Sequence, residues 1–303
     1  MSESLKGQWL CSLAMVLVGS TVVVSKIIGQ DIEPFLATVL RHAAALPVFL
    51  FLMARTGARF PRVSRRDAAL LLVQAAAGSV GYSVLLIQGV NLSSAADAGI
   101  VAGTLPAASA LFAALLLGER PGARLVLSIG LATVGVMAVA MAPDAGAQAP
   151  TRLQGIALVL GAIACEAVFI LANKRLSQPV PALALSTCMC AGGLLMSALP
   201  AWLALQASPS VWSTAALAGV AYYAWVPTVG GFLLWYAGSA QTSGARAALS
   251  TVWLPVSALL LSALFLGEAI YAWQWMGLGC VLLAMLLAVP GSVKVAQPQA
   301  SLP

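Results

Sequence analysis

The chain has very little charge. Only 8% of its 303 residues are Asp, Glu, Lys or Arg, whereas 61% are hydrophobic and the mean hydropathy is +0.98. Soluble domains average about 25% charged residues and about 45–50% apolar residues. Because no soluble fold could bury so much apolar surface, the composition excludes a soluble globular domain. It indicates a polytopic membrane protein, in which each span needs about 20 apolar residues.

The chain also lacks the residue patterns of enzymes and metal sites. His42 is the only histidine, and the five cysteines all lie within apolar runs, where cysteine behaves as a small buried hydrophobe. The sequence contains no His-Glu-x-x-His, no Gly-x-Ser-x-Gly and no Walker A motif. We therefore expect no metal, no cofactor and no disulfide framework, and a membrane enzyme is the weakest functional alternative.

Long apolar runs are what the chain does have. They show no alternation of polar and apolar residues, which favours transmembrane helices over a β-barrel. We predict an all-α protein with ten transmembrane helices, five in each half. The predicted spans are Gln8–Ile28, Pro34–Ala54, Ala68–Gln88, Ala95–Leu117, Ala123–Ala142, Leu153–Ala172, Leu183–Gln206, Trp212–Ser239, Gly244–Leu266 and Tyr271–Ala288.

One stretch of the chain occurs twice. Residues 105–119 and 254–268 each have proline at the second position, an apolar run and a final Gly-Glu, at a constant offset of 149 residues. A period near half the chain indicates a duplicated half, as in transporters built from two related halves. We predict a first five-helix repeat at 1–142, a linker at 143–152, a second repeat at 153–290 and a cytoplasmic tail at 291–303.

Loop charges predict the orientation, because Lys and Arg are retained on the cytoplasmic side. Twelve of the fifteen basic residues fall on one side if both termini are cytoplasmic: Lys6, Arg55, Arg59, Arg62, Arg65, Arg66, Arg120, Arg124, Lys174, Arg175, Arg246 and Lys294. The net charge of +6 therefore reflects topology, and we expect no nucleic-acid partner. Since five helices per half is an odd number, the second half enters the membrane from the opposite face, giving an inverted repeat.

These features resemble the drug/metabolite transporter superfamily, in its EamA-type branch. The resemblance lies in the ten spans, the duplication, and the paired Pro…Gly-Glu endings followed by Gly130 and Gly279. Pro34 followed by Arg41, early in the second span, also resembles that branch's first repeat. It implies a carrier of the bacterial-type inner membrane, usually an exporter, that works by alternating access through a central cavity. Within the family, the chain is most similar to exporters of amino acids, aromatic ones included, that also pass paraquat.

Polar residues inside the spans are the candidates for the substrate cavity. Intramembrane charge is costly and usually faces a cavity or a partner. We expect His42, which ordinarily titrates near neutral pH, or Glu166 to bind a coupling proton or the substrate's amino group. Tyr82, Tyr223 and Trp225 would line the cavity and stack on flat or cationic solutes. The alternatives are a satisfied interior polar residue for His42 or Glu166 and simple helix packing for the aromatic rings.

Five further residues are candidate gate or hinge positions. Pro106 and Pro255 lie near the middle of related spans, where proline removes a helix hydrogen bond. We expect a hinge there, a static kink being the alternative. Arg41 would pair with an acid or with backbone oxygens and help to close the outer gate. Lys26 and Lys174 end the first span of each half, where ordinary snorkelling explains them equally well.

Glu119 and Glu268 end their helices, a position at which the helix dipole disfavours an acid. We expect each to bond backbone amides of the following turn rather than substrate.

The leading hypothesis is a secondary transporter that exports small organic solutes. A passive facilitator or channel is the main alternative, because no ion-coupling site is obvious. The expected partners are a small-molecule substrate, the lipid bilayer and a coupling proton; the exact substrate and the oligomeric state stay open.

Overall fold

The computed structural model describes residues 3–117, 122–141, 149–207 and 211–288, and these form helices without any strand. Gly118, Glu119, linker residues 143–148 and the predicted tail lie outside the described residues. The helices are α1 Glu3–Asp31, α2 Pro34–Thr56, α3 Arg65–Gln74, η1 Ala75–Gly81, α4 Tyr82–Leu92, α5 Ala95–Ala102, α6 Leu105–Leu117, α7 Ala123–Ala140, α8 Ala149–Lys174, α9 Ala182–Ala207, α10 Thr214–Tyr223, η3 Ala224–Gly231, α11 Phe232–Gln241, α12 Gly244–Ser250, α13 Trp253–Leu266 and α14 Ala272–Ala288.

The predicted spans all fall on helices. Not all of these helices, however, are long and apolar enough to cross a membrane by themselves. Within the described ranges, eight helical stretches qualify by themselves, and α5 with α6, bent by 47°, makes a ninth. The last helix, α14, is apolar but has only 17 residues. The boundaries also differ from prediction: α8 already begins at Ala149, so residues 149–152 are helix rather than linker.

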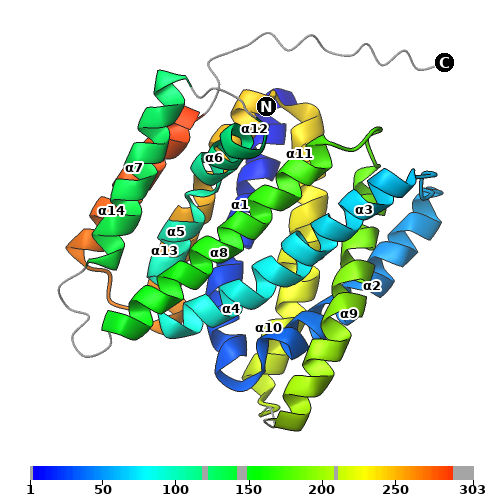
Figure 1. Cartoon of the computed structure of the whole chain (residues 1–303), viewed down its shortest axis with the longest axis horizontal. Coiled ribbons are helices and arrows are strands. Elements are labelled where there is room, and N and C mark those ends of the chain that lie inside the picture. Colours follow the sequence, from blue (N-terminus) through cyan, green and yellow to red (C-terminus); the bar gives the residue numbers. More distant parts are fainter. Residues whose placement is uncertain (1–2, 118–121, 142–148, 208–210, 289–303) are drawn as a thin grey trace.

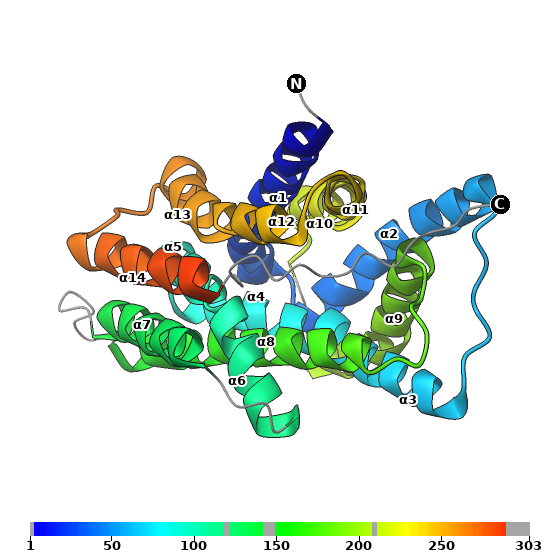
Figure 2. The same ribbon diagram turned by 90° about the horizontal axis from the view of Figure 1, so that it is seen from above.

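The helices are arranged in related pairs. Figure 2 shows α2 and α9 together on one side of the molecule and α7 and α14 together on the other, with α1, α4 and α8 between them. In the centre, α4 packs on α8, and α11 packs on α1 in the same way. Figure 1 shows that α1 begins and α14 ends at the same end of the molecule.

Two of these contacts bring backbones together at glycines. A Cβ atom placed on Gly89 of α4 would lie 2.8 Å from the carbonyl oxygen of Gly155 on α8, and one on Gly155 would lie 2.7 Å from that of Gly89. Gly238 of α11 and Gly7 of α1 are equally close. A Cβ atom placed on either glycine would lie 2.7 Å from the carbonyl oxygen of the other. Small residues permit such crossings between helices in a membrane. The two glycine pairs occupy equivalent places in the two halves of the sequence.

The two repeated proline segments follow helix breaks. Helix α5 ends at Ala102 and α6 begins at Leu105, so Pro106 is the second residue of α6. In the other half α12 ends at Ser250, and Pro255 is the third residue of α13. Because proline has no N–H to bond the carbonyl four residues earlier, the helix ends before it. The prolines therefore lie in the first turn after a break instead of inside a continuous kinked helix.

A second pair of irregular segments was not predicted from the sequence. The segments η1 and η3 are π-helical turns, and each lies in the middle of a long span, between α3 and α4 or between α10 and α11. In η3, the hydroxyl of Thr228 donates to the carbonyl of Tyr223, five residues earlier, at 2.8 Å. Turns of this kind inside helices are frequent at functional sites.

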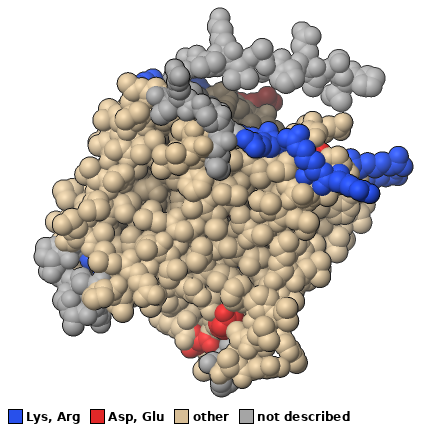
Figure 3. All heavy atoms as spheres, viewed as in Figure 1, with Lys and Arg blue, Asp and Glu red and all other residues tan. Residues whose placement is uncertain are grey.

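The surface charge is divided between the two ends of the molecule. On the face seen in Figure 3, Lys and Arg side chains gather at the end where α1 begins, and a cluster of acidic side chains lies at the opposite end. The broad belt between them is largely uncharged. A belt of this kind suits contact with lipid.

Candidate functional site

A cavity of about 130 Å³ lies where the two π-helical segments face α2 and α9. Its polar lining consists of Arg41, His42, Ser79, Ser186 and Thr228. Ser79 of η1 and Thr228 of η3 are 149 residues apart, the same offset as the repeated proline segments. The cavity is therefore lined by equivalent segments of the two halves.

Arg41 is the fixed charge of this cavity. Its Nη2 donates to Ser83 Oγ at 2.7 Å and to the Ser79 carbonyl at 3.4 Å, and its guanidinium carbon lies 4.5 Å from the centre of the Tyr223 ring. Its Nε is buried and has no hydrogen-bond partner. The expected bond to a backbone oxygen is present, but none of the described acids pairs with Arg41. This guanidinium therefore has unused capacity for an acceptor.

His42 is held by both ring nitrogens. Nδ1 lies 2.7 Å from the Thr38 carbonyl, which can only accept, so Nδ1 carries the hydrogen. Nε2 lies 3.1 Å from Nη2 of Arg41, which can only donate, so Nε2 accepts. A second proton on this ring would have to bind Nε2, where it would point at the N–H donor of Arg41. The geometry favours the interior structural role for His42, whose ring is also within 2.6 Å of a Cβ built on Gly193.

Glu166 and two tyrosines form the other part of the candidate site. Tyr82 begins α4 directly after η1, and Tyr223 ends α10 directly before η3. Tyr82 lies within electrostatic range of Tyr223, Glu166 and Arg41. Tyr223 is buried, with 4% of its surface exposed, whereas Arg41, Tyr82 and Glu166 are half-buried. The structure thus brings together four of the residues predicted from the sequence, with one cation and one carboxylate.

Trp225 lies elsewhere. Its side chain is 55% exposed, and its indole N–H donates to the Ala44 carbonyl at 3.1 Å. It is not among the residues that line the cavity, so its position does not support the prediction that it does.

The two candidate gate lysines differ. Lys26 Nζ donates to the carbonyls of Val90 at 2.8 Å, Asn91 at 3.3 Å and Ser93 at 2.8 Å, and so caps the C-terminus of α4. Lys174 is exposed at the last turn of α8. At one end of the molecule, Lys26 of α1 is therefore hydrogen-bonded to the end of α4. At the other end, the equivalent Lys174 is exposed.

Glu268 fastens the two halves together. Its two carboxylate oxygens accept from the backbone N–H groups of Ala95 and Ala96, each at 2.9 Å, at the start of α5. The expectation that it bonds amides is thus confirmed, but the amides belong to a helix of the other half rather than to the following turn. An acid at a helix N-terminus is favoured by the dipole.

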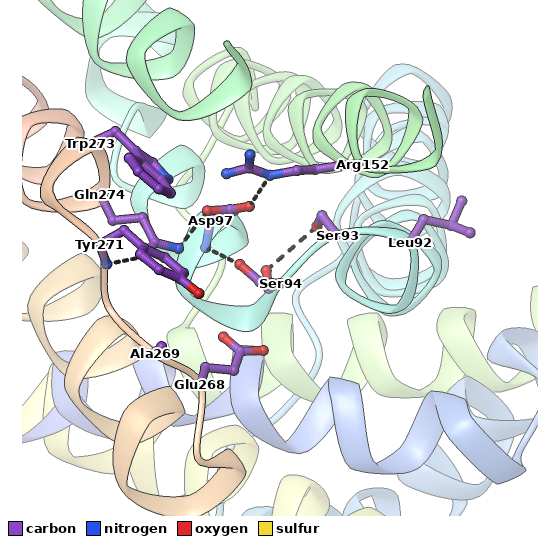
Figure 4. A pocket seen from close by; sticks show the side chains of 10 residues that line it. All are labelled: Leu92, Ser93, Ser94, Asp97, Arg152, Glu268, Ala269, Tyr271, Trp273 and Gln274. Atoms are coloured by element: carbon purple, nitrogen blue, oxygen red, sulfur yellow. Dashed lines mark hydrogen bonds and ion pairs between the residues drawn. The ribbon is translucent and has the colours of Figure 1, made fainter. Parts of the chain in front are cut away.

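A buried ion pair lies beside Glu268 (Figure 4). Asp97, only 1% exposed, accepts from Arg152 Nε at 2.7 Å and from Gln274 Nε2 at 2.8 Å. Neither Asp97 nor Arg152 was among the candidate site residues predicted from the sequence. The 55 residues that separate them contain no local signal for this contact, although a charged residue three positions after a capping serine was a usable clue for Asp97.

The fold and the site together define a class. A bundle of apolar helices that encloses a polar cavity between two related sets of helices is the architecture of a polytopic membrane transporter.

Comparisons with known proteins give the family. The sequence model of the EamA-like transporter family matches residues 5–141 and again residues 153–289. The chain belongs to this family.

Three relatives are known by name. "Uncharacterized transporter YetK" of Bacillus subtilis (strain 168) is 35% identical over 95% of this chain and 87% of its own length. A "Probable terminal-alkyne amino-acid exporter" of Streptantibioticus cattleyicolor is 30% identical over 70% of this chain and 69% of its own length. "Uncharacterized transporter YdeK" of Bacillus subtilis is 28% identical over 95% of this chain and 96% of its own length.

A solved crystal structure shares the fold. It is 20% identical to this chain, with a TM-score of 0.64, and the match covers 93% of this chain and 96% of the other.

Proposed function

We propose that this chain is a secondary transporter that exports amino acids, aromatic ones included, across the bacterial inner membrane by alternating access. The observation that carries the proposal is Arg41, a cation without an acidic partner among the described residues, in a cavity between the two halves. One relative is named as a probable amino-acid exporter, which supports the same substrate class.

The charges of the site suit an amino acid. Unpaired intramembrane charge is costly, so the open side of Arg41 favours a ligand that brings a carboxylate. Glu166, within electrostatic range of Tyr82, provides a place for the ammonium group or for a coupling proton. The rings of Tyr82 and Tyr223 offer flat surfaces to an aromatic side chain.

Paraquat is the contrasting solute. It carries two positive charges and no carboxylate, so Arg41 would repel it. We still propose flat organic cations of this kind as substrates, but as poorer ones than amino acids.

We also propose that residues 1–142 and 153–290 form an inverted repeat with both termini in the cytoplasm. The two separate family matches, the paired glycine crossings and the paired π-helical segments support the repeat. The basic side chains at the end where α1 begins support the orientation.

The experiment is efflux of labelled phenylalanine, threonine and paraquat from proteoliposomes that contain only this protein, with and without a pH gradient. We expect saturable flux of phenylalanine, faster when the gradient is imposed, and weaker flux of paraquat. Flux that does not saturate would instead support a passive facilitator. The absence of flux for all three solutes would contradict the amino-acid proposal.

A further inference from the structure

A second pocket lies at the end of the molecule where α4 ends and α5 and α8 begin (Figure 4). It has a volume of about 280 Å³ and is separate from the central cavity. Its polar lining comes from both halves of the chain and from the start of α8. The residues are Ser93, Ser94 and Asp97 in the first half, Arg152 on α8, and Glu268, Tyr271, Trp273 and Gln274 in the second half. With the predicted orientation, this is the outer end.

Two side chains of this pocket offer hydrogen-bond donors to a ligand. Arg152 uses its Nε on Asp97, and its guanidinium is part of the pocket lining. The indole N–H of Trp273 is buried and has no acceptor in the described part of the chain. Figure 4 shows the Trp273 ring and the Arg152 guanidinium facing each other beside Asp97. Because a buried donor without a partner is costly, the Trp273 N–H favours an acceptor group placed between it and the Arg152 guanidinium.

The donors are held rigidly. Asp97 is fixed by Arg152 and Gln274, and the Trp273 ring is stacked on Tyr271 with 4.6 Å between the ring centres and 10° between the planes. A site whose groups are already in place loses little conformational entropy when a ligand binds. The exposed Tyr271 also offers an aromatic surface next to the donors.

The charges around the pocket are balanced. Lys26 lies within electrostatic range of both Glu268 and Asp97, so two cations and two carboxylates surround this region. A ligand with a net charge would upset this balance, whereas a zwitterion would not. Glu268 uses one lone pair of each oxygen on the α5 amides and keeps capacity for a further donor.

We propose that this pocket is a second binding site for a zwitterionic amino acid, occupied as the solute leaves the protein. Arg152 and Trp273 bind the carboxylate, Glu268 receives the ammonium group, and the Tyr271–Trp273 stack contacts the side chain. The proposal rests on the proposed function because it takes the exported solute as the ligand.

The test is calorimetric titration of phenylalanine into the full-length protein in lipid nanodiscs. We expect two binding events in the unmodified protein. Trp273→Phe keeps the ring but removes the N–H, and it should weaken one event about fivefold. Arg152→Lys keeps the charge beside Asp97 but loses the planar fork, and it should weaken the same event about tenfold.

Trp275→Phe, two residues along α14 on an exposed side chain, is the matched control and should change neither event. Phenethylamine, which lacks the carboxylate, should bind this pocket at least tenfold more weakly than phenylalanine. A single binding event that neither Trp273→Phe nor Arg152→Lys alters would overturn the proposal. Because binding is read without transport, missing efflux in proteoliposomes would count against the proposed function instead.

Discussion

At the scale of single residues, the candidate site depends on a few polar side chains in an apolar chain. Arg41 and Glu166 were identifiable from the sequence because charge inside a span is rare. Ser79 and Thr228 were not, because hydroxyl residues within helices usually bond their own backbone, as Thr228 does, and look alike wherever they lie. Only the fold, which packs η1 on α9 and η3 on α2, shows that they face one cavity.

Arg41 should decide recognition of the carboxylate. We expect Arg41→Gln to lower kcat/KM for phenylalanine efflux at least tenfold, because a charge-assisted hydrogen bond contributes about 1.5–3 kcal/mol. Arg41→Lys should retain part of the activity, since it keeps the positive charge but loses the planar guanidinium that can donate two parallel hydrogen bonds to a carboxylate. Arg59→Gln, in an exposed loop, is the control. Full activity of Arg41→Gln would rule out this role.

Glu166 should carry the coupling to the proton gradient. We expect Glu166→Gln, which cannot titrate, to remove the stimulation of phenylalanine flux by an imposed pH gradient. Exchange of phenylalanine between the two sides should continue, because exchange needs no net proton movement. If His42→Ala removed the stimulation and Glu166→Gln did not, the coupling would belong to His42 and not to Glu166.

At the scale of helices, backbone contacts at glycines hold the two halves together. Gly89 and Gly155 join α4 to α8, and Gly238 and Gly7 join α11 to α1. At these crossings no side chain separates the helices, so even a methyl group must displace the backbone.

Gly89→Ala and Gly238→Ala should each lower the free energy of unfolding by about 1–3 kcal/mol, because the added methyl group overpacks a backbone contact. Gly130→Ala on α7 is the control, since a Cβ there meets nothing within 4 Å and alanine is the better helix former. Thermal unfolding in detergent measures the effect. Equal stability of Gly89→Ala and Gly130→Ala would contradict the described crossing.

The elements themselves were largely predictable, but their irregularities were not. Apolar run lengths located every long helix to within a few residues, and Pro106 and Pro255 indicated where two spans are interrupted. The π-helical segment η1 has no comparable local signal, since it contains only Ala, Gly, Ser and Val, whereas η3 contains Pro227. The bonds of Glu268 to the start of α5 and of Asp97 to Arg152 depend on which helices meet, which local sequence does not encode.

At the scale of the whole molecule, the two ends differ in how the halves are joined. Glu268, Asp97 and Arg152 join the halves at one end, where Lys26 also caps α4. At the other end Lys174, the counterpart of Lys26, is exposed. In an inverted repeat, exchange of these two arrangements would open one side and close the other, which is the change that alternating access requires.

The orientation can be tested by labelling. Val211→Cys should react with a membrane-impermeant maleimide in intact cells, whereas Arg59→Cys should react only after permeabilisation, because the basic loop is expected inside. The native cysteines in the described spans are buried or half-buried, so their background should be low. The opposite pattern would mean that the termini are outside.

Counterflow tests the central claim most directly. Proteoliposomes loaded with excess unlabelled phenylalanine are diluted into a trace of labelled phenylalanine, and the labelled solute inside is followed over time. A carrier that works by alternating access predicts a transient accumulation of label above its outside concentration, and Arg41→Gln should diminish it. Label that only rises to equilibrium would contradict the account and indicate a passive pore.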